Sequence, residues 1–353
     1  QGEASSTYPG SILMPTSIAT IGLDIAKRSF EVHGVDEHGR PALRRRLGRG
    51  QVLGFFANLP PCRVGLEACG GAHYWARELT KLGHDVRLMP AQYVKPYVKR
   101  NKHDAADAEA CCEAVQRPNM RFVPIKTDDQ QALLMLHRIR DRLQAERTGT
   151  INAIRGHMTE FGIVAATRGR GMAELATIIA DVDDARLPPI ARELLSAQLD
   201  HLRAIEARID ELDRRLRAQA RDHAPTRELV NLPGIGPVVA TAMTATVGDA
   251  RMFANGRGFA AWLGLVPRQH ATGGRERLLG ISKRGDGYLR RQLMHGARAL
   301  VRVAKGRDTG IHAWINRLLE RRHPNVVVAA VANKLARWIW VVLARGVRFE
   351  APA

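Results

Sequence analysis

The chain has 353 residues, 45% hydrophobic and 25% charged, a composition typical of a folded protein that excludes a disordered one. It carries 54 Lys and Arg against 35 Asp and Glu, and the net charge of +19 predicts a polyanionic partner, with nucleic acid the first choice. Aromatic residues make up only 5%, so we expect contacts to phosphates rather than a large base-stacking surface.

The N-terminal segment and the cysteines bear on the cellular setting. Residues 1–16 are polar and turn-rich and lack a signal-peptide pattern, so we interpret them as a leader or expression remnant outside the fold. No run approaches the ~18 apolar residues of a membrane span, and we expect no membrane partner. The four cysteines contain no Cys-x-x-Cys pair, which favours reduced thiols in a cytoplasm over a zinc site.

Residues 17–127 are predicted to form a mixed α/β domain. Ile21, Leu23 and Ile25 alternate with small or acidic residues, which indicates a strand with Asp24 on its small-residue face. Glu67 lies on the face of a glycine in a later strand of the same kind. Short apolar runs and turn residues predict the other elements: strands at 30–35, 42–47, 63–69 and 85–89, and helices at 74–82 and 101–115.

Residues 128–224 are predicted to be a helical coiled-coil or oligomerisation region. Apolar residues recur at spacings of three and four over 128–161 and again over 190–222, with charged residues between them. The segment 162–171 and the pair Pro188-Pro189 are expected to interrupt the helices.

Residues 225–353 are predicted to form a mainly α-helical C-terminal domain. The segment 232–236 reads Leu-Pro-Gly-Ile-Gly between two apolar stretches and resembles a helix-hairpin-helix turn. The backbone amides of Gly234 and Gly236 would then receive a phosphate. The strongly apolar run 326–343 is expected to be a closing helix.

Four acids in the first third are candidate metal ligands. Asp24 and Glu67 lie on strands, and Asp104 and Asp107 are three apart on one predicted helix face. A carboxylate in an apolar strand is costly when it is buried and unpaired, and a bound cation removes that cost. Carboxylate and water ligands suit Mg²⁺ or Mn²⁺, and a pair of such ions supports phosphoryl transfer.

Basic residues accompany both halves of this pattern. Lys99, Arg100 and Lys102 precede the helix acids, where a phosphate backbone would pass. The stretch from Arg268 to Gly285 combines glycine-bearing turns with the hydroxyl of Thr272, and we expect a loop that presents a nucleophile to a phosphodiester. The cations expected to contact the nucleic-acid backbone in this region are Arg268, Lys283, Arg284, Arg290 and Arg291.

Together these segments carry a resemblance. The acidic motifs resemble the Asp-Glu-Asp-Asp site of a RuvC-like (RNase H-like) domain: Gly22-Leu23-Asp24-Ile25-Ala26-Lys27, Gly65-Leu66-Glu67-Ala68 and Lys102-His103-Asp104-Ala105-Ala106-Asp107-Ala108. The later motifs resemble the transposase domain of the insertion-sequence one-ten family, eleven-eleven group: Leu232-Pro233-Gly234-Ile235-Gly236, the run from Phe259 to Arg268 and Ile281-Ser282-Lys283-Arg284-Gly285.

The resemblance implies an RNA-guided recombinase of a bacterial or archaeal cytoplasm, working close to the nucleoid. A structured guide RNA (a bridge or seeker RNA) would pair with donor and target DNA. The acids Asp24, Glu67, Asp104 and Asp107 would hold Mg²⁺ or Mn²⁺. A hydroxyl from the transposase domain of another subunit, in a homodimer or homotetramer, would form a covalent protein–DNA intermediate and so keep the bond energy for rejoining.

The nucleophile departs from the family pattern, which has a serine in this loop. Counting from Pro267 places Thr272 on the nucleophile position, whereas many group members have serine one residue earlier, where Ala271 stands. Either Thr272 is the nucleophile or Ala271 replaces a serine. Two other functions use the same residues: a metal-dependent junction nuclease in which water attacks, and a non-enzymatic RNA- or DNA-binding protein.

Overall fold

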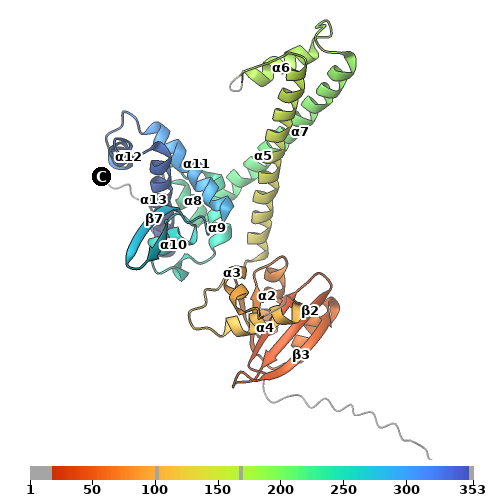
Figure 1. Ribbon diagram of the computed structural model, residues 1–353, viewed down its shortest axis with the longest axis vertical. Coiled ribbons are helices and arrows are strands. Elements are labelled where there is room, and N and C mark those ends of the chain that lie inside the picture. Colours follow the sequence, from red (N-terminus) through yellow and green to blue (C-terminus); the bar gives the residue numbers. More distant parts are fainter. Residues whose placement is uncertain (1–17, 100–102, 167–169, 350–353) are drawn as a thin grey trace, which may run out of the picture. The chain divides into compact units, whose positions relative to one another are not determined.

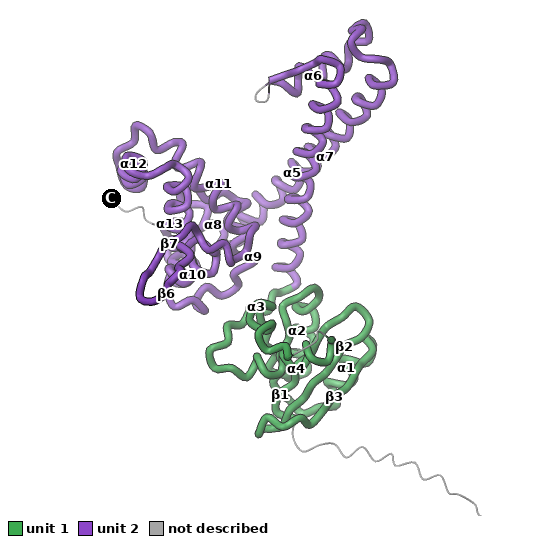
Figure 2. The backbone as a smooth tube through the Cα atoms, viewed as in Figure 1, with its two compact units in different colours: residues 1–127 green, residues 128–353 purple. Residues whose placement is uncertain are grey.

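The computed structural model describes residues 18–99, 103–166 and 170–349. The interpretation of residues 1–16 lies outside these ranges. The chain divides into two compact units, residues 1–127 and residues 128–353 (Figure 2), and each is described by itself.

The first unit is built on a five-stranded sheet with the order β3-β2-β1-β4-β5. β1 runs antiparallel to β2 and parallel to β4, and β4 runs parallel to β5. The prediction of a mixed α/β domain is confirmed, and all five expected strands are present: β1 (Thr20–Ile25), β2 (Ser29–Val35), β3 (Pro41–Gly48), β4 (Arg63–Glu67) and β5 (Asp85–Met89).

Helices cover both faces of this sheet (Figure 1). The larger apolar core joins strand residues such as Ile21 and Leu23 to α1 (Val52–Ala57) and α2 (Ala72–Lys81). The opposite face receives α4 (Asp104–Val115), which contacts β1, β2 and β4. Two short helical segments lead into α4: α3 (Ala91–Val94) and the 3-10 turn Lys95–Tyr97.

A pair of glycines lets α4 approach the sheet closely. Gly22 of β1 lies beside Gly65 of β4 in the parallel register. A Cβ atom on Gly22 would stand 2.0 Å from the carbonyl oxygen of Ala108, and one on Gly65 would stand 2.7 Å from the Cβ of Val115. The backbone of α4 therefore rests almost directly on the two strands, and no larger residue fits between them.

The second unit begins with a helical arm of α5 (Asp128–Glu160), α6 (Gly171–Ala180) and α7 (Pro189–Asp222). The two long helices run antiparallel (Figure 1), and their side chains pair across the seam, with Arg147 Nε 2.8 Å from Glu206 Oε1. The long helices were predicted from their apolar spacing. α6 was not predicted, and its apolar residues pack into the core at the tip of the arm.

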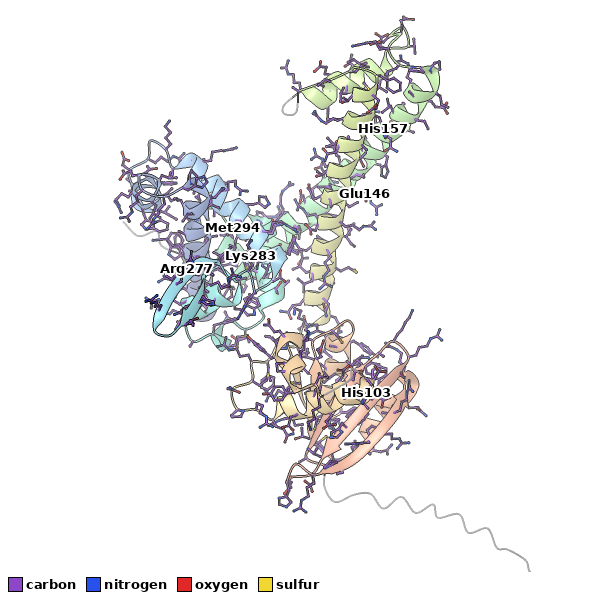
Figure 3. The ribbon with its side chains drawn as sticks, viewed as in Figure 1. His103, Glu146, His157, Arg277, Lys283 and Met294 are labelled. Atoms are coloured by element: carbon purple, nitrogen blue, oxygen red, sulfur yellow. The ribbon has the colours of Figure 1, made fainter. Side chains whose placement is uncertain are left out.

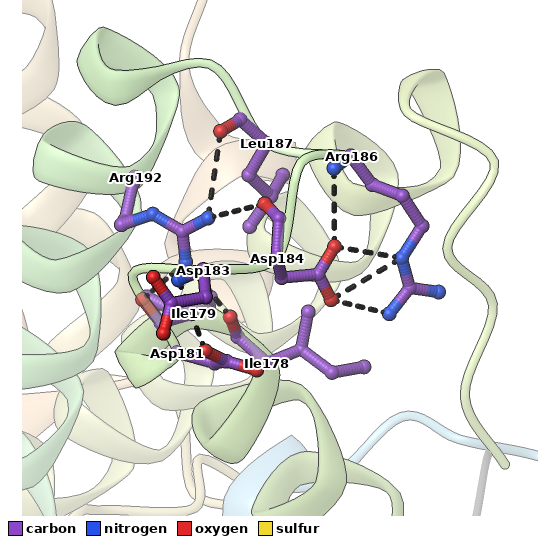
Figure 4. Close-up of polar contacts among 8 residues, drawn as sticks. All are labelled: Ile178, Ile179, Asp181, Asp183, Asp184, Arg186, Leu187 and Arg192. Carbon is purple, nitrogen blue, oxygen red and sulfur yellow. Dashed lines mark hydrogen bonds and ion pairs between the residues drawn. The ribbon is translucent and has the colours of Figure 1, made fainter.

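An arginine closes the tip of this arm. The guanidinium of Arg192 on α7 donates four hydrogen bonds, of 2.7–3.4 Å, to backbone carbonyls at the end of α6 and in the α6–α7 connection (Figure 4). These carbonyls belong to Ile178, Ile179, Asp184 and Leu187. The orphan carbonyls at the end of α6 thus find a charged donor instead of water.

The rest of the second unit is a mainly helical domain around one apolar core, with a two-stranded hairpin added. The hairpin was not predicted. The elements are α8 (Ala224–Val230), α9 (Pro237–Val247), α10 (Gly256–Trp262), β6 (Pro267–Thr272), β7 (Arg275–Ile281), α11 (Gly287–Val303), α12 (Gly310–Leu319) and α13 (Pro324–Arg345).

The closing helix α13 corrects one expectation. By length and composition it is apolar enough to cross a membrane, contrary to the expectation that no run of the chain approaches a membrane span. In the structure many of its apolar side chains, among them Val331, Leu335 and Ile339, are fully buried in the core of the helical domain. Packing against α10 and α11 accounts for its composition.

A buried polar network joins the foot of the arm to the helical domain. The Thr241 hydroxyl donates to the carbonyl of Pro237, so it accepts a hydrogen bond from Nε2 of His137 on α5. The other ring nitrogen of His137 then accepts from the Tyr288 hydroxyl at 2.9 Å. Burial, with a smaller contribution from the charge of Arg140, lowers the pKa of His137 to about 4, so the ring is neutral.

Candidate active site

Three of the four predicted acids meet at one edge of the sheet. One carboxylate oxygen from each of Asp24, Asp104 and Asp107 lies within 4.8 Å of the others. Asp24 follows Gly22 by two residues, so it shares the face on which α4 lies. Asp104 and Asp107 are in the first turn of α4. Because α4 packs closely against β1 at Gly22, these two residues lie near the end of β1.

Glu67 stands beside this cluster without belonging to it. It ends β4 two residues after Gly65, on the same face, and its carboxylate is not among the three that converge. Its charge nevertheless contributes to the raised pKa of Asp24.

The electrostatics of the cluster favour a cation. Burial, followed by the charges of Asp107 and Asp104, raises the pKa of Asp24 to about 6. Among the residues that the structure describes, none forms an ion pair with any of the four acids. Hard carboxylate oxygens with uncompensated charge fit Mg²⁺ or Mn²⁺.

The thiols near the site do not fit a metal role. Cys111 and Cys112 are buried in α4, and burial raises the pKa of Cys111 strongly and that of Cys112 to about 12. They are therefore protonated and act as small apolar residues between helix and sheet. His103 also has a structural contact, because its Nδ1 accepts a hydrogen bond from the amide of Ala106 and caps α4.

Of the cations predicted to precede α4, Lys99 alone lies within the described ranges. Its ammonium is 2.8 Å from Glu109 and remains largely exposed. Arg100 and Lys102 fall outside the described residues. A surface ion pair of this kind is weak, so Lys99 stays available to a phosphate.

The stretch expected to be a nucleophile loop is instead a β-hairpin, β6–β7. Its turn is Gly273–Gly274, and both glycines have positive φ (56° and 76°), the pattern of a two-residue turn that favours glycine. Every residue of β6 is exposed, including Ala271 and Thr272. The Gly-Gly pair signals such a turn, but the flanking residues lack the apolar alternation that identifies strands.

The base of the hairpin, in contrast, is firmly held. A Cβ atom on Gly285 would lie 2.0 Å from the carbonyl oxygen of Trp262, and one on Gly264 would lie 2.8 Å from the amide of Arg284. Lys283 adopts a positive φ of 56°, which a non-glycine residue rarely does. Figure 3 labels Lys283 at this base and Arg277 farther out on β7. The hairpin therefore has an exposed tip and a closely packed base.

The other predicted cations divide into two groups. Arg268, Lys283 and Arg284 are exposed. Arg290 donates to the carbonyls of Leu263 and Gly285. Arg291 is 2.6 Å from Asp141 of the arm. Arg290 and Arg291 thus each have a partner within the protein, although the Arg291 ion pair is exposed.

The turn predicted to receive a phosphate connects α8 and α9. Gly234 has a positive φ of 78° and packs against α11, where a Cβ atom would lie 2.8 Å from Leu300. Gly236 precedes the first turn of α9, and a Cβ there would have no neighbour within 4 Å. Packing against α11 explains the glycine at Gly234. The absence of neighbours at Gly236 leaves the N-terminus of α9 accessible to an anion.

Comparison with known proteins finds a family match in each half of the chain. A family model for the DEDD transposase domain of IS110 matches residues 21–163, and one described as transposase IS116/IS110/IS902 family matches residues 226–310.

Relatives match over most of their length. A probable family 20 transposase of Pseudomonas aeruginosa is 54% identical over 93% of this chain and 98% of its own. The transposase for insertion sequence element IS1328 of Yersinia enterocolitica is 41% identical over 95% and 99%. That for IS1111A of Coxiella burnetii is 40% identical over 93% and 90%. The chain belongs to the IS116/IS110/IS902 family of transposases, enzymes that break and rejoin DNA strands.

Proposed function

We propose that this transposase is an RNA-guided DNA recombinase that uses a protein hydroxyl as its nucleophile. The convergence of Asp24, Asp104 and Asp107, with Glu67 beside them, carries the proposal. Three carboxylates within 4.8 Å repel one another, and a fold that holds them together is suited to divalent cations.

The proposed catalytic domain is RuvC-like and spans residues 17–127. The strand order β3-β2-β1-β4-β5, with β1 antiparallel to β2 and parallel to β4, supports this assignment. Its four acids would bind Mg²⁺ or Mn²⁺. When bound, such ions neutralise phosphate charge and lower the barrier to displacement at phosphorus. The chain itself orients the carboxylates, because Gly22 and Gly65 let α4 pack closely against the sheet.

The proposed nucleophile is the Thr272 hydroxyl. Its oxygen would attack the DNA phosphorus, the bond from phosphorus to the leaving sugar oxygen would break, and the hydroxyl proton would pass to solvent or a nearby base. The leaving oxygen would take up a proton in turn. A phosphothreonyl–DNA link would preserve the phosphodiester for strand exchange. Ala271 has no nucleophilic atom, so it can take this role only where serine stands in its place.

The remaining parts of the proposal concern assembly. Residues 128–224 would form a coiled-coil region and residues 225–353 the transposase domain with its helix-hairpin-helix-like turn. Exposed apolar residues on the arm, Ile190 and Leu194 on α7, support contact with a second subunit in a homodimer or homotetramer. A hairpin from one subunit would complete the acidic site of another.

The proposed partners are a guide RNA and the donor and target DNA, in the cytoplasm of a bacterial or archaeal cell. The net charge of +19 supports extended contact with phosphates. Lys99, Arg268, Lys283 and Arg284 are the exposed cations proposed for that contact. Sequence specificity would come mainly from base pairing with the RNA, as in other RNA-guided systems.

The test begins with the RNA that co-purifies with the protein. Sequencing should find one structured species, whereas random host RNA would contradict RNA guidance. The complex is then incubated with Mg²⁺ and end-labelled DNA from the termini of the insertion sequence. Denaturing gels should show a protein–DNA adduct that Thr272→Ala and Asp24→Asn abolish and Thr272→Ser retains.

Cleavage without an adduct would instead identify a water-dependent nuclease. Full activity of Asp24→Asn and Glu67→Gln would identify a binding protein. The acidic cluster favours an enzyme over the second of these outcomes, because a binding surface for polyanions has no use for converging carboxylates.

A further inference from the structure

The register of the β6–β7 hairpin sorts its side chains onto two faces. Thr272 pairs with Arg275, and His270 pairs with Arg277. Directly opposed residues of an antiparallel pair project to the same side, and successive residues alternate. These four side chains therefore share one face, which we call the Thr272 face. The opposite face carries Ala271 with Glu276 and Gln269 with Leu278.

The two faces differ in charge. The Thr272 face holds two guanidinium groups and an imidazole beside the hydroxyl. Glu276, the sole carboxylate in the sequence of β6 and β7, lies on the other face. Within the described part of the chain, Arg275, Arg277 and His270 have no hydrogen-bond or ion-pair partner. Two arginines side by side without an acid repel each other, and a bound anion removes that repulsion.

The geometry suits a phosphodiester better than a protein surface. Opposed Cβ atoms in such a hairpin lie about 4.5–5.5 Å apart. An Arg275 guanidinium can therefore contact the non-bridging oxygens of a phosphate whose phosphorus is next to the Thr272 hydroxyl. Arg277 lies two residues along β7 and reaches the following stretch of the same strand. Guanidinium groups bind phosphate through two parallel hydrogen bonds.

We propose that the Thr272 face is a DNA phosphate-binding site in which Arg275 and Arg277 hold the phosphodiester that Thr272 attacks. His270 adds a hydrogen-bonding imidazole beside them. This rests on the proposed function, and it decides between the two candidate nucleophile positions. A hydroxyl at position 271 would share its face with Glu276, whose charge repels a phosphate. Ala271→Ser therefore does not replace the Thr272 hydroxyl.

The first test measures binding without chemistry. The full-length protein is titrated with a duplex DNA oligonucleotide of arbitrary sequence over a range of salt concentrations. Arg275→Gln and Arg277→Gln should each lower the slope of log K against log salt by about 0.9, the value for one lost phosphate contact. Glu276→Gln introduces the same side chain on the opposite face and should not lower the slope. The tip is exposed, so melting temperatures should not change.

The second test uses the covalent adduct. Arg275→Gln should slow adduct formation about 100-fold, the usual cost of removing one charge-stabilising donor, and Glu276→Gln should leave it within about threefold. The double variant that combines Thr272→Ala with Ala271→Ser should form no adduct. Equal salt slopes for Arg275→Gln and Glu276→Gln overturn the phosphate site, and so does a slope change seen with an RNA duplex but not with DNA. An active Thr272→Ala contradicts the proposed function instead.

Discussion

Replacing Asp24 by asparagine should stabilise the metal-free protein, which is unusual for a proposed active-site substitution. The carboxyl group of Asp24 has a pKa of about 6 instead of 3.8, because burial and the neighbouring Asp107 and Asp104 disfavour its charge. That difference corresponds to at most about 3 kcal/mol at neutral pH. The side chain is partly exposed, so solvent screening reduces the expected gain to about 1–2 kcal/mol.

The sign of the pH dependence follows from the direction of this shift. Between pH 3.8 and about 6 the folded state binds the Asp24 proton and the unfolded state releases it, so this group makes stability fall as pH rises through that window. The advantage of Asp24→Asn should be full above about pH 6 and vanish below about pH 4. With Mg²⁺ the order should reverse, because a ligand at 100 times its Kd stabilises the wild type by about 2.7 kcal/mol.

Hydrogen exchange measured by mass spectrometry is the suitable assay, because peptides from β1, β4 and α4 report on the first unit alone. Exchange is followed in EDTA and in Mg²⁺ at pH 7.5 and pH 5, and the rates are corrected for the pH dependence of intrinsic amide exchange. Asp104→Asn, on an exposed carboxylate of the same cluster, is the matched comparison and should gain less in EDTA. If Asp24→Asn is no more protected than wild type in EDTA at pH 7.5, or responds equally to Mg²⁺, the cation site is refuted.

Three further substitutions test the architecture. Gly22→Ala should push α4 from the sheet, cost about 1–3 kcal/mol by overpacking and remove protection by Mg²⁺, while Gly54→Ala, which meets no neighbour within 4 Å, should be neutral or stabilising by unfolding measurements. His137→Ala should lower the free energy of unfolding, measured with denaturant, by about 2–4 kcal/mol. Because the pKa of His137 in the folded protein is lowered to about 4, the stability of the wild type should fall as pH drops from 6.5 to 4. The variant should lack this pH dependence. Arg192→Met should speed exchange at residues 178–187 at least tenfold, whereas Arg186→Met, which removes an exposed ion pair, should change it less than threefold.

The acidic site could be predicted because local sequence encodes it. Strand alternation placed Asp24 and Glu67 on the same faces as Gly22 and Gly65, and helical spacing placed Asp104 and Asp107 on one face. The separate position of Glu67 relative to the three converging carboxylates could not be predicted. It depends on the position of α4 along the strands of the sheet, and contacts between residues far apart in the sequence set that position.

The C-terminal half was harder to predict for two physical reasons. The β6–β7 hairpin buries almost nothing at its tip, so its residues carry no apolar period. Arg290 and Arg291 look like free cations in the sequence. Their partners are carbonyls of a neighbouring turn and Asp141, which is 150 positions earlier in the chain. Such pairings follow from tertiary structure alone.

The exposure of the hairpin tip has a consequence for protein engineering. Because the helical core does not depend on the residues around Gly273–Gly274, these positions can be randomised with little loss of folded protein. The clamped base formed by Gly264 and Gly285 would keep every variant tip aimed in the same direction. A library confined to this tip would therefore explore new reactivity on an unchanged scaffold.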